Sequence, residues 1–294
     1  MLAALQLARL GGSDRERAPS ISVCWMFATS GRARLAFDIT GVERGADVLL
    51  LHAGVNDRRS WHHVVERLGS RHRCVAFDMR GAGETTYERE TGWSPVSDAL
   101  AVLDAAGVEQ PAVVACSIGG AVAVDLALAC PDRVAGLVLI GAAVRGAPYP
   151  EISEGPTAEL NARIAAADAA GDVEEVERLD AWLWLDGPSA EEGRVAGPAR
   201  ELFLDMNGRA LRAEDPGEQA EIPSAWDRLG EITVPTLVLV GRLDADKIRA
   251  VDEQAAALIP GARLRWLDGV AHVPHLEGDP TTLEEIAAFV DALS

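Results

Sequence analysis

Short apolar runs alternate with longer stretches of helical periodicity along most of the chain. The apolar runs predict strands at residues 33–39, 47–52, 73–78, 111–116, 134–141, 233–241 and 262–267. Apolar residues recur at helical spacing in residues 61–68, 95–106, 118–129, 247–259 and 281–293. This alternation indicates an α/β fold with a mostly parallel central sheet, because right-handed crossovers between parallel strands place helices on both faces.

Residues 145–229 interrupt this alternation of predicted strands and helices. The segment is acidic, prone to helix formation and punctuated by Pro and Gly, and it predicts helices within residues 151–170, 172–185 and 191–211. We interpret it as a helical cap inserted into an α/β core made of residues 26–144 and 230–294. Residues 1–25 are predicted to form an N-terminal extension outside this core.

Composition and charge limit the classes of function. The chain has 294 residues, of which 48% are hydrophobic, so it can bury a full core. Its 27 basic against 46 acidic residues give a net charge of -19, which repels nucleic acid phosphates and anionic membrane surfaces. No apolar run approaches the roughly 18 residues that span a bilayer. With no basic signal-peptide lead and four widely spaced cysteines, the sequence predicts a cytoplasmic protein without nucleic acid or membrane partners.

The strongest local signal for chemistry is a serine at the junction between a predicted strand and the following helix. Ser117 follows the apolar run at residues 111–116, and small residues stand two positions before and after it, at Ala115 and Gly119. Small residues there let strand and helix approach closely, and a helix N-terminus favours developing negative charge. The pattern predicts a nucleophile elbow, with a serine that merely caps the helix as the alternative.

A serine nucleophile needs a base and an acid that orients it. Asp244 directly follows the predicted strand at residues 233–241, and Asp246 is a rival two residues later. Either carboxylate could instead cap the next helix. His272 lies in the loop after the last predicted strand, so the chain order is Ser, Asp, His.

From about Ser30 to its C-terminus, the chain resembles the α/β-hydrolase superfamily. Three further motifs carry the likeness besides the ordered Ser, Asp and His. Residues 52–54 (His-Ala-Gly) resemble the oxyanion segment of the family, and residues 78–83 (Asp-Met-Arg-Gly-Ala-Gly) resemble its structural D-x-R-G-x-G turn. Residues 272–280 are similar to its terminal segment, whose first His is catalytic.

The resemblance implies a role for each residue of the candidate site. Ser117 would be the nucleophile, His272 the general base and then acid, and Asp244 the group that orients His272 and stabilises its charge. The backbone N–H groups of Gly54 and Ile118 would form the oxyanion hole.

The implied activity is hydrolysis of a small carboxylic ester or lactone through an acyl-enzyme, without a cofactor. Residues 51–61 look like the corresponding part of enol-lactone hydrolases, and the related cofactor-free haloperoxidases and perhydrolases share the general pattern. A carbon-carbon bond hydrolase, a perhydrolase or an acyltransferase could use the same triad. A non-catalytic small-molecule binding protein is the alternative from another class. The register at residues 52–54 leaves Val55 as an alternative oxyanion donor.

The remaining polar motifs predict structural roles. His62 and His63 are expected to cap a helix or face solvent. His272 and His275 have HxxH spacing, but they lie in a loop without a carboxylate cluster, so we predict no metal site, and no nucleotide-binding loop occurs. We expect His275 to be a hydrogen-bonded surface residue, with pocket lining as the alternative. Residues 57–59 (Asp-Arg-Arg) are expected to form a solvated loop with an internal ion pair, with a clamp for a substrate carboxylate as the alternative.

Overall fold

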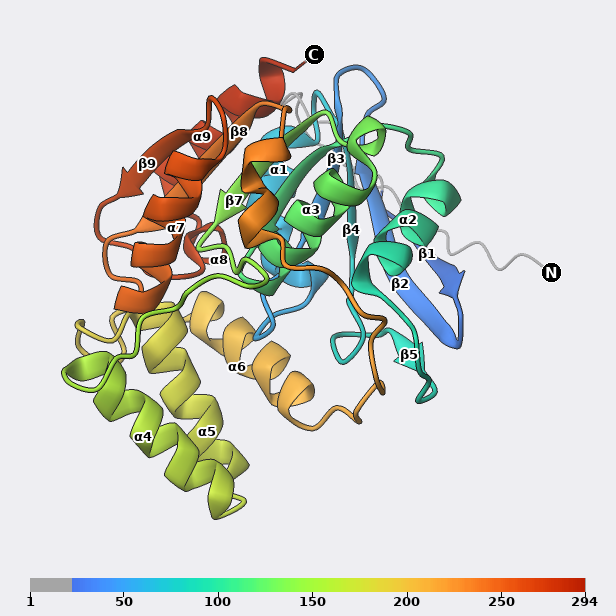
Figure 1. Ribbon diagram of the computed structural model, residues 1–294. Helices are drawn as coiled ribbons and strands as arrows, with labels where there is room; N and C mark the ends of the chain where they lie inside the picture. Colours follow the sequence, from blue (N-terminus) through green and yellow to red (C-terminus); the bar gives the residue numbers. More distant parts are fainter. Residues whose placement is uncertain (1–22, 294) are drawn as a thin grey trace, which may run out of the picture.

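A nine-stranded sheet forms the centre of the protein (Figure 1). The computed structural model describes residues 23–293, and residues 1–22 and 294 lie outside the description. The strands follow the order β1-β2-β4-β3-β6-β7-β8-β9, and β5 pairs with β2. Their bounds are β1 Val23–Ser30, β2 Ala33–Gly41, β3 Asp47–Leu51, β4 Arg73–Phe77, β5 Thr86–Tyr87, β6 Ala112–Cys116, β7 Gly136–Ile140, β8 Thr236–Gly241 and β9 Arg263–Leu267. Strands β1, β2 and β5 pair antiparallel, and the pairs from β4 to β9 are parallel. This confirms the mostly parallel sheet.

Helices cover both faces of the sheet. Their bounds are α1 His62–Leu68, α2 Pro95–Ala106, α3 Ile118–Ala129, α4 Pro156–Ala169, α5 Val173–Asp180, α6 Pro198–Leu211, α7 Asp246–Leu258, α8 Pro274–Glu277 and α9 Pro280–Asp291. Buried residues of α2, α3 and α7 share one apolar cluster with alternate strand residues, and those of α1 and α9 share the cluster on the other face. None of the helices between residues 23 and 293 is both long enough and apolar enough to cross a membrane.

Strand β3 shows why the central strands read as continuous apolar runs. Leu49 and Leu51 enter one cluster and Val48 and Leu50 the other, and all four are fully buried. A parallel strand that is covered by helices on both faces has apolar residues at successive positions, so its sequence does not alternate between apolar and polar residues.

The antiparallel edge of the sheet corrects the predicted N-terminal boundary. Val23–Ser30 forms β1, which pairs along its length with β2, so residues 23–25 belong to the core rather than to the expected extension. The tight connection through Gly31, whose φ is 53°, turns the chain directly back into β2. Residues 1–22 of the expected extension lie outside the described residues.

The connection between β7 and β8 contains the helices α4, α5 and α6, which lie together on one side of the sheet-bearing part (Figure 1). Helix α5 passes into a π-helical turn, Ala181–Asp186. Helix α6 begins with Pro198 in its first turn, where proline loses no intrahelical hydrogen bond. Helical segments thus occur in each of the three predicted ranges.

Candidate active site

Ser117 occupies the sharp turn between β6 and α3. Its φ of 54° and ψ of -120° make it the one non-glycine residue with positive φ between residues 23 and 293. Its N–H donates to the Ile140 carbonyl at 3.0 Å, and its carbonyl accepts from the Ala143 N–H at 2.9 Å, so the strained backbone is held from both sides. A Cβ at Gly119 would lie 2.4 Å from the Leu51 carbonyl oxygen, which is why a glycine follows. Ser117 stands at the N-cap position of α3, but its side chain makes no capping hydrogen bond to the helix.

A buried Asp–His pair lies at the ends of β8 and β9. The Nδ1 atom of His272 is 2.8 Å from Oδ2 of Asp244, and both side chains are almost wholly buried. The other oxygen of Asp244 accepts from the Ala245 N–H at 2.7 Å. Asp246 instead has a half-exposed side chain at the start of α7 and pairs with Arg249, so the carboxylate that contacts the imidazole is Asp244. A proton on Nδ1 leaves Nε2 of the neutral ring free to accept one.

The backbone of the serine turn and the Asp–His pair meet at one edge of the sheet. The Cys116 thiol, next to Ser117, donates to the His272 carbonyl at 3.3 Å. A Cβ at Gly141, after β7, would lie 2.8 Å from Nδ1 of His272 and 2.9 Å from Oδ2 of Asp244. Only glycine therefore leaves room for the pair. The ring centroid of Trp184 lies 4.7 Å from that of the His272 imidazole.

Gly54 and Ile118, the two residues that the sequence singled out as oxyanion donors, lie next to each other. Gly54 follows β3, and a Cβ there would touch Cγ2 of Ile118 at 3.6 Å. The Ile118 N–H opens α3, whose N-terminus favours negative charge. His52 braces the turn before Gly54, because its Nδ1 lies 2.7 Å from the Ala53 carbonyl and its Nε2 accepts from the Met79 N–H at 3.0 Å. Burial lowers the pKa of His52, so the ring is neutral in this structural role.

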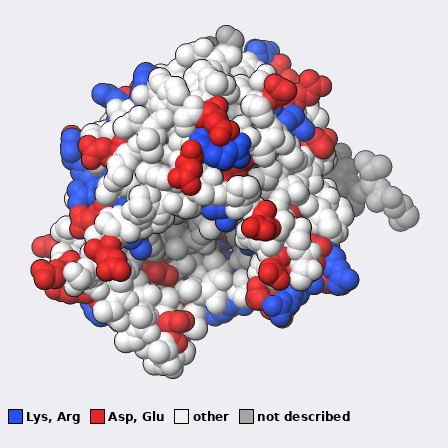
Figure 2. Space-filling model, in the orientation of Figure 1, with Lys and Arg blue, Asp and Glu red and all other residues white. Residues whose placement is uncertain are grey.

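A cavity of about 380 Å³ adjoins Gly54 and Ile118. Apolar side chains make up most of its wall, and the end of α6 and residues 213–216 also line it. Figure 2 shows this face of the molecule hollowed between the sheet-bearing part and the helices of the β7–β8 connection. Apolar clefts of this size, with a few polar groups, are typical binding sites for small molecules.

Residues 48–286 match the model of the alpha/beta hydrolase family. The chain belongs to this family. It is 28% identical over 270 residues to the putative carbamate hydrolase RutD of Azorhizobium caulinodans. This match covers 84% of this chain and 91% of the relative. It is 37% identical over 236 residues to the 2-hydroxymuconate semialdehyde hydrolase of Pseudomonas sp. strain CF600. This match covers 77% of this chain and 63% of the relative.

Solved structures agree with the family assignment. The malate-bound thermophilic esterase from Thermogutta terrifontis superimposes with a TM-score of 0.70 at 24% identity, over 92% of this chain and 99% of the esterase. At that identity the likeness shows the fold. Together with the family match and the curated relatives, it confirms the resemblance seen in the sequence, and this chain is an enzyme of the alpha/beta hydrolase family.

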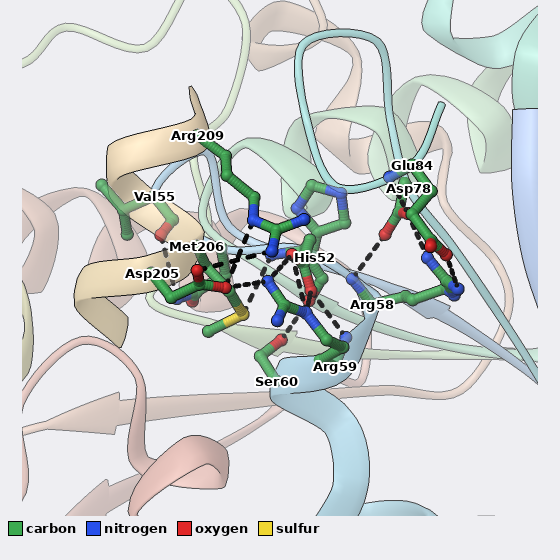
Figure 3. Close-up of polar contacts among 12 residues, drawn as sticks. His52, Val55, Arg58, Arg59, Ser60, Asp78, Glu84, Asp205, Met206 and Arg209 are labelled. Atoms are coloured by element: carbon green, nitrogen blue, oxygen red, sulfur yellow. Dashed lines mark hydrogen bonds and ion pairs between the residues drawn. The ribbon is translucent and has the colours of Figure 1, made fainter. Parts of the chain in front are cut away.

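The loop at residues 57–59 is more buried than we expected for this alpha/beta hydrolase. Arg58 is buried, and its guanidinium binds Asp78 and, at 2.6 Å, Glu84 (Figure 3). It also binds Asp38 at 2.8 Å. The expectation of a solvated loop is wrong here, because two segments distant in sequence supply three carboxylates around one cation. These bonds occupy the guanidinium, which leaves the alternative of a clamp for a substrate carboxylate without support at Arg58.

Arg59 makes the internal ion pair that the sequence predicted. Its guanidinium lies 2.6 Å from Asp57, and it also reaches Asp205 on α6 at 2.8 Å (Figure 3). The Asp57 N–H points to the sulfur of Met206, also on α6, at 3.4 Å. These contacts tie α6, which borders the cavity, to the loop after Gly54.

His275 contradicts the expectation of a hydrogen-bonded surface residue. It is fully buried, stacks on Trp61 with 4.0 Å between ring centroids, and neither ring nitrogen has a hydrogen-bond partner among the described residues. Burial lowers its pKa to about 3. The short helix α8 starts at Pro274 and turns this side chain inward, which HxxH spacing does not reveal.

Sequence reasoning missed one buried acid near the site. Asp252 on α7 accepts from the Ala142 N–H at 3.1 Å with one oxygen, and the other has no partner within residues 23–293. Burial, with the nearby charge of Asp244, raises the pKa of Asp252. The available signal was an acid within the apolar face of a predicted helix, next to Val251 and one turn before Ala255.

Proposed function

We propose that this protein is a cofactor-independent serine hydrolase that cleaves a carboxylic ester or lactone through an acyl-enzyme on Ser117. The observation that carries the proposal is the strained turn of Ser117, which stands at the same sheet edge as the Asp244–His272 pair. Backbone strain of this kind costs about 1–3 kcal/mol and clusters at functional sites. Helices α4 to α6 act as the cap in this proposal, because the end of α6 borders the cavity.

Each side chain then has one chemical task. Nε2 of His272 takes the hydroxyl proton as Oγ of Ser117 attacks the carbonyl carbon, and Asp244 stabilises the imidazolium. The oxyanion accepts hydrogen bonds from the N–H groups of Gly54 and Ile118, each worth about 3 kcal/mol in such sites. The intermediate collapses when His272 gives the proton to the leaving alkoxide oxygen. Water, deprotonated by His272, then attacks the acyl carbon. The bond to Oγ breaks, His272 returns the proton to Oγ of Ser117, and the acid is released.

A panel of p-nitrophenyl esters and simple lactones tests the proposal. Wild type should hydrolyse at least one of them, and Ser117→Ala should lower kcat by at least about 10⁴-fold, as loss of a triad nucleophile does. Ser70→Ala, at an exposed serine before β4, is the matched control and should retain the activity. Hydrolysis that survives Ser117→Ala would show that another residue is the nucleophile.

The 37% identity to 2-hydroxymuconate semialdehyde hydrolase supports a second candidate function. The same three side chains would then act on a semialdehyde that bears a carboxylate. Adding 2-hydroxymuconate semialdehyde to the panel separates the two candidates. Turnover of this compound above that of the best ester or lactone would favour the second.

A further inference from the structure

The cavity beside Gly54 and Ile118 has walls that offer little to a charged group. Phe77, Trp93, Ile118 and Val122 line it, and apolar atoms dominate its surface. A charge moved into such surroundings loses hydration, and it needs a partner there to offset the loss.

Arg80 is the one cation that lines the cavity within the described part of the chain, and its guanidinium is already bound. Nε and Nη2 donate to the two oxygens of Asp98 at 2.8 and 3.0 Å, Nη1 binds Glu90, and Nη2 also donates to the Ser30 carbonyl at 3.0 Å. The guanidinium stacks on Trp93 at 4.5 Å, and only 1% of the side chain is exposed. A substrate carboxylate therefore finds no free cation at Arg80.

Two exposed carboxylates, Glu214 and Asp215, also line the cavity, just after α6. Their segment is fixed in place, because the Tyr87 hydroxyl donates to the Glu214 carbonyl and residues 216–220 form backbone hydrogen bonds with residues 90–93. The backbone that carries these two carboxylates is thus held beside the cavity.

The charged side chains that line the cavity carry a net negative charge. Asp98 balances Arg80, and Asp215 pairs at 3.1 Å with Arg89, but both of those side chains are largely exposed and such pairs are weak. Glu214 makes no ion pair within residues 23–293. With a net charge of -19 on the whole protein, the local field opposes an approaching anion.

We propose that this cavity takes an uncharged, apolar acyl group and rejects acyl groups that end in a carboxylate, with Glu214 and Asp215 as specificity-determining residues. The inference rests on the proposed serine hydrolase function and runs against the second candidate, whose substrate carries a carboxylate.

Three p-nitrophenyl esters with six-carbon acyl chains test the inference: one ends in methyl, one in carboxylate and one in trimethylammonium. Wild type should prefer the methyl ester to the carboxylate ester by at least about 100-fold in kcat/KM, since both desolvation and repulsion oppose the anion. In the double variant Glu214→Gln/Asp215→Asn, this preference should fall about tenfold. The preference for the trimethylammonium ester over the carboxylate ester should fall in the same variant, because the two removed carboxylates attract the cation and repel the anion.

The double variant Asp132→Asn/Glu253→Gln is the matched control. It removes the same charge at exposed positions that do not line the cavity, and it should leave the preferences as in wild type. A carboxylate ester cleaved within about threefold of the methyl ester would overturn the inference, since an anion would then meet no barrier. The inference would also be overturned if Glu214→Gln/Asp215→Asn left the preference for the methyl ester unchanged. The same holds if the control variant changed this preference by as much as Glu214→Gln/Asp215→Asn does.

A binding measurement separates failure of this inference from failure of the proposed function. If wild type cleaves none of these esters and none of the panel of p-nitrophenyl esters and simple lactones, the serine hydrolase proposal fails. Titration of tryptophan fluorescence with hexanamide and with the monoamide of adipic acid then still tests the charge preference, because Trp93 lines the cavity. Equal affinities for the two amides would overturn it, and tighter binding of hexanamide would support it.

Discussion

Replacing Arg58 by methionine removes a buried cation while keeping most of its aliphatic volume. The Arg58 side chain is 8% exposed, and it binds the fully buried Asp78 and the more accessible Glu84 (Figure 3). It also binds Asp38, which is more accessible than Asp78. The substitution leaves the Asp78 carboxylate in the interior without its counter-charge. We expect this carboxylate to dominate the loss of stability, because accessible carboxylates regain water.

The structure sets the size of the effect. Removing one partner of a buried ion pair costs about 3–5 kcal/mol. Asp78 keeps two charge-assisted bonds, from the backbone N–H groups of Arg58 at 2.9 Å and Glu84 at 2.8 Å. The expected loss in free energy of unfolding is therefore near the lower limit, about 3 kcal/mol near neutral pH.

The pH dependence has a defined sign. Burial raises the pKa of Asp78 in the folded protein, and Arg58 opposes that rise. Without the guanidinium the folded-state pKa rises further above the unfolded value. The folded variant then takes up a proton that the unfolded chain does not, so the penalty is largest at high pH and shrinks as the pH falls toward the folded-state pKa.

Urea unfolding followed by tryptophan fluorescence measures the loss for Arg58→Met at about pH 7.5 and about pH 5. Arg32→Met is the control, because its pair with Glu88 is 61% and 78% exposed and should be worth less than about 0.5 kcal/mol. A loss below about 1 kcal/mol at the higher pH, or an equal loss at both, would refute the reasoning about the buried carboxylate.

Three further substitutions test other parts of the structure. Asp244→Asn should lower kcat for the best ester by about 10⁴-fold without changing the melting temperature, because the amide favours the wrong tautomer of His272; a loss below about tenfold would contradict this role. His275→Phe keeps the ring contact with Trp61. Since burial lowers the pKa of His275 to about 3, the unfolded chain alone takes up its proton below its ordinary pKa. The stability advantage of the variant over wild type, measured by thermal unfolding, should therefore grow by about 2 kcal/mol as the pH falls from about 7 to 5. A stability difference that stays constant over this pH range would contradict the prediction. Ser117→Gly should be about 1 kcal/mol more stable than Ser117→Ala in urea, because glycine adopts positive φ without strain; the reverse order would contradict a strained turn.

The sheet could be predicted from the sequence where burial is complete, and less well at its edge. Continuous apolar runs such as Asp47–Leu51 follow from strands covered on both faces. Strand β1 was not predicted, because its pairing with β2 depends on a hairpin rather than on burial of both faces. Residues Val23–Ser30 begin with six apolar residues and end with Thr and Ser, so they lack the alternation that marks a strand with one buried face.

The candidate site shows the same division. Ser117 carries a local signature of strand, turn and small residues, so its strained turn could be anticipated. The choice between Asp244 and Asp246 required the folded chain, since two residues decide which carboxylate reaches the imidazole. The burial of Arg58 and of His275 also depends on segments distant in sequence, which no local pattern reports.

The central claim is that Ser117 is an activated nucleophile, and covalent labelling tests it most directly. Incubation with a fluorophosphonate probe followed by intact-protein mass spectrometry should show a single adduct on wild type, located at Ser117 by peptide mapping. Ser117→Ala should gain none. No adduct on the folded wild-type protein, as for a non-catalytic binding protein, or an adduct on a different residue, would contradict the account.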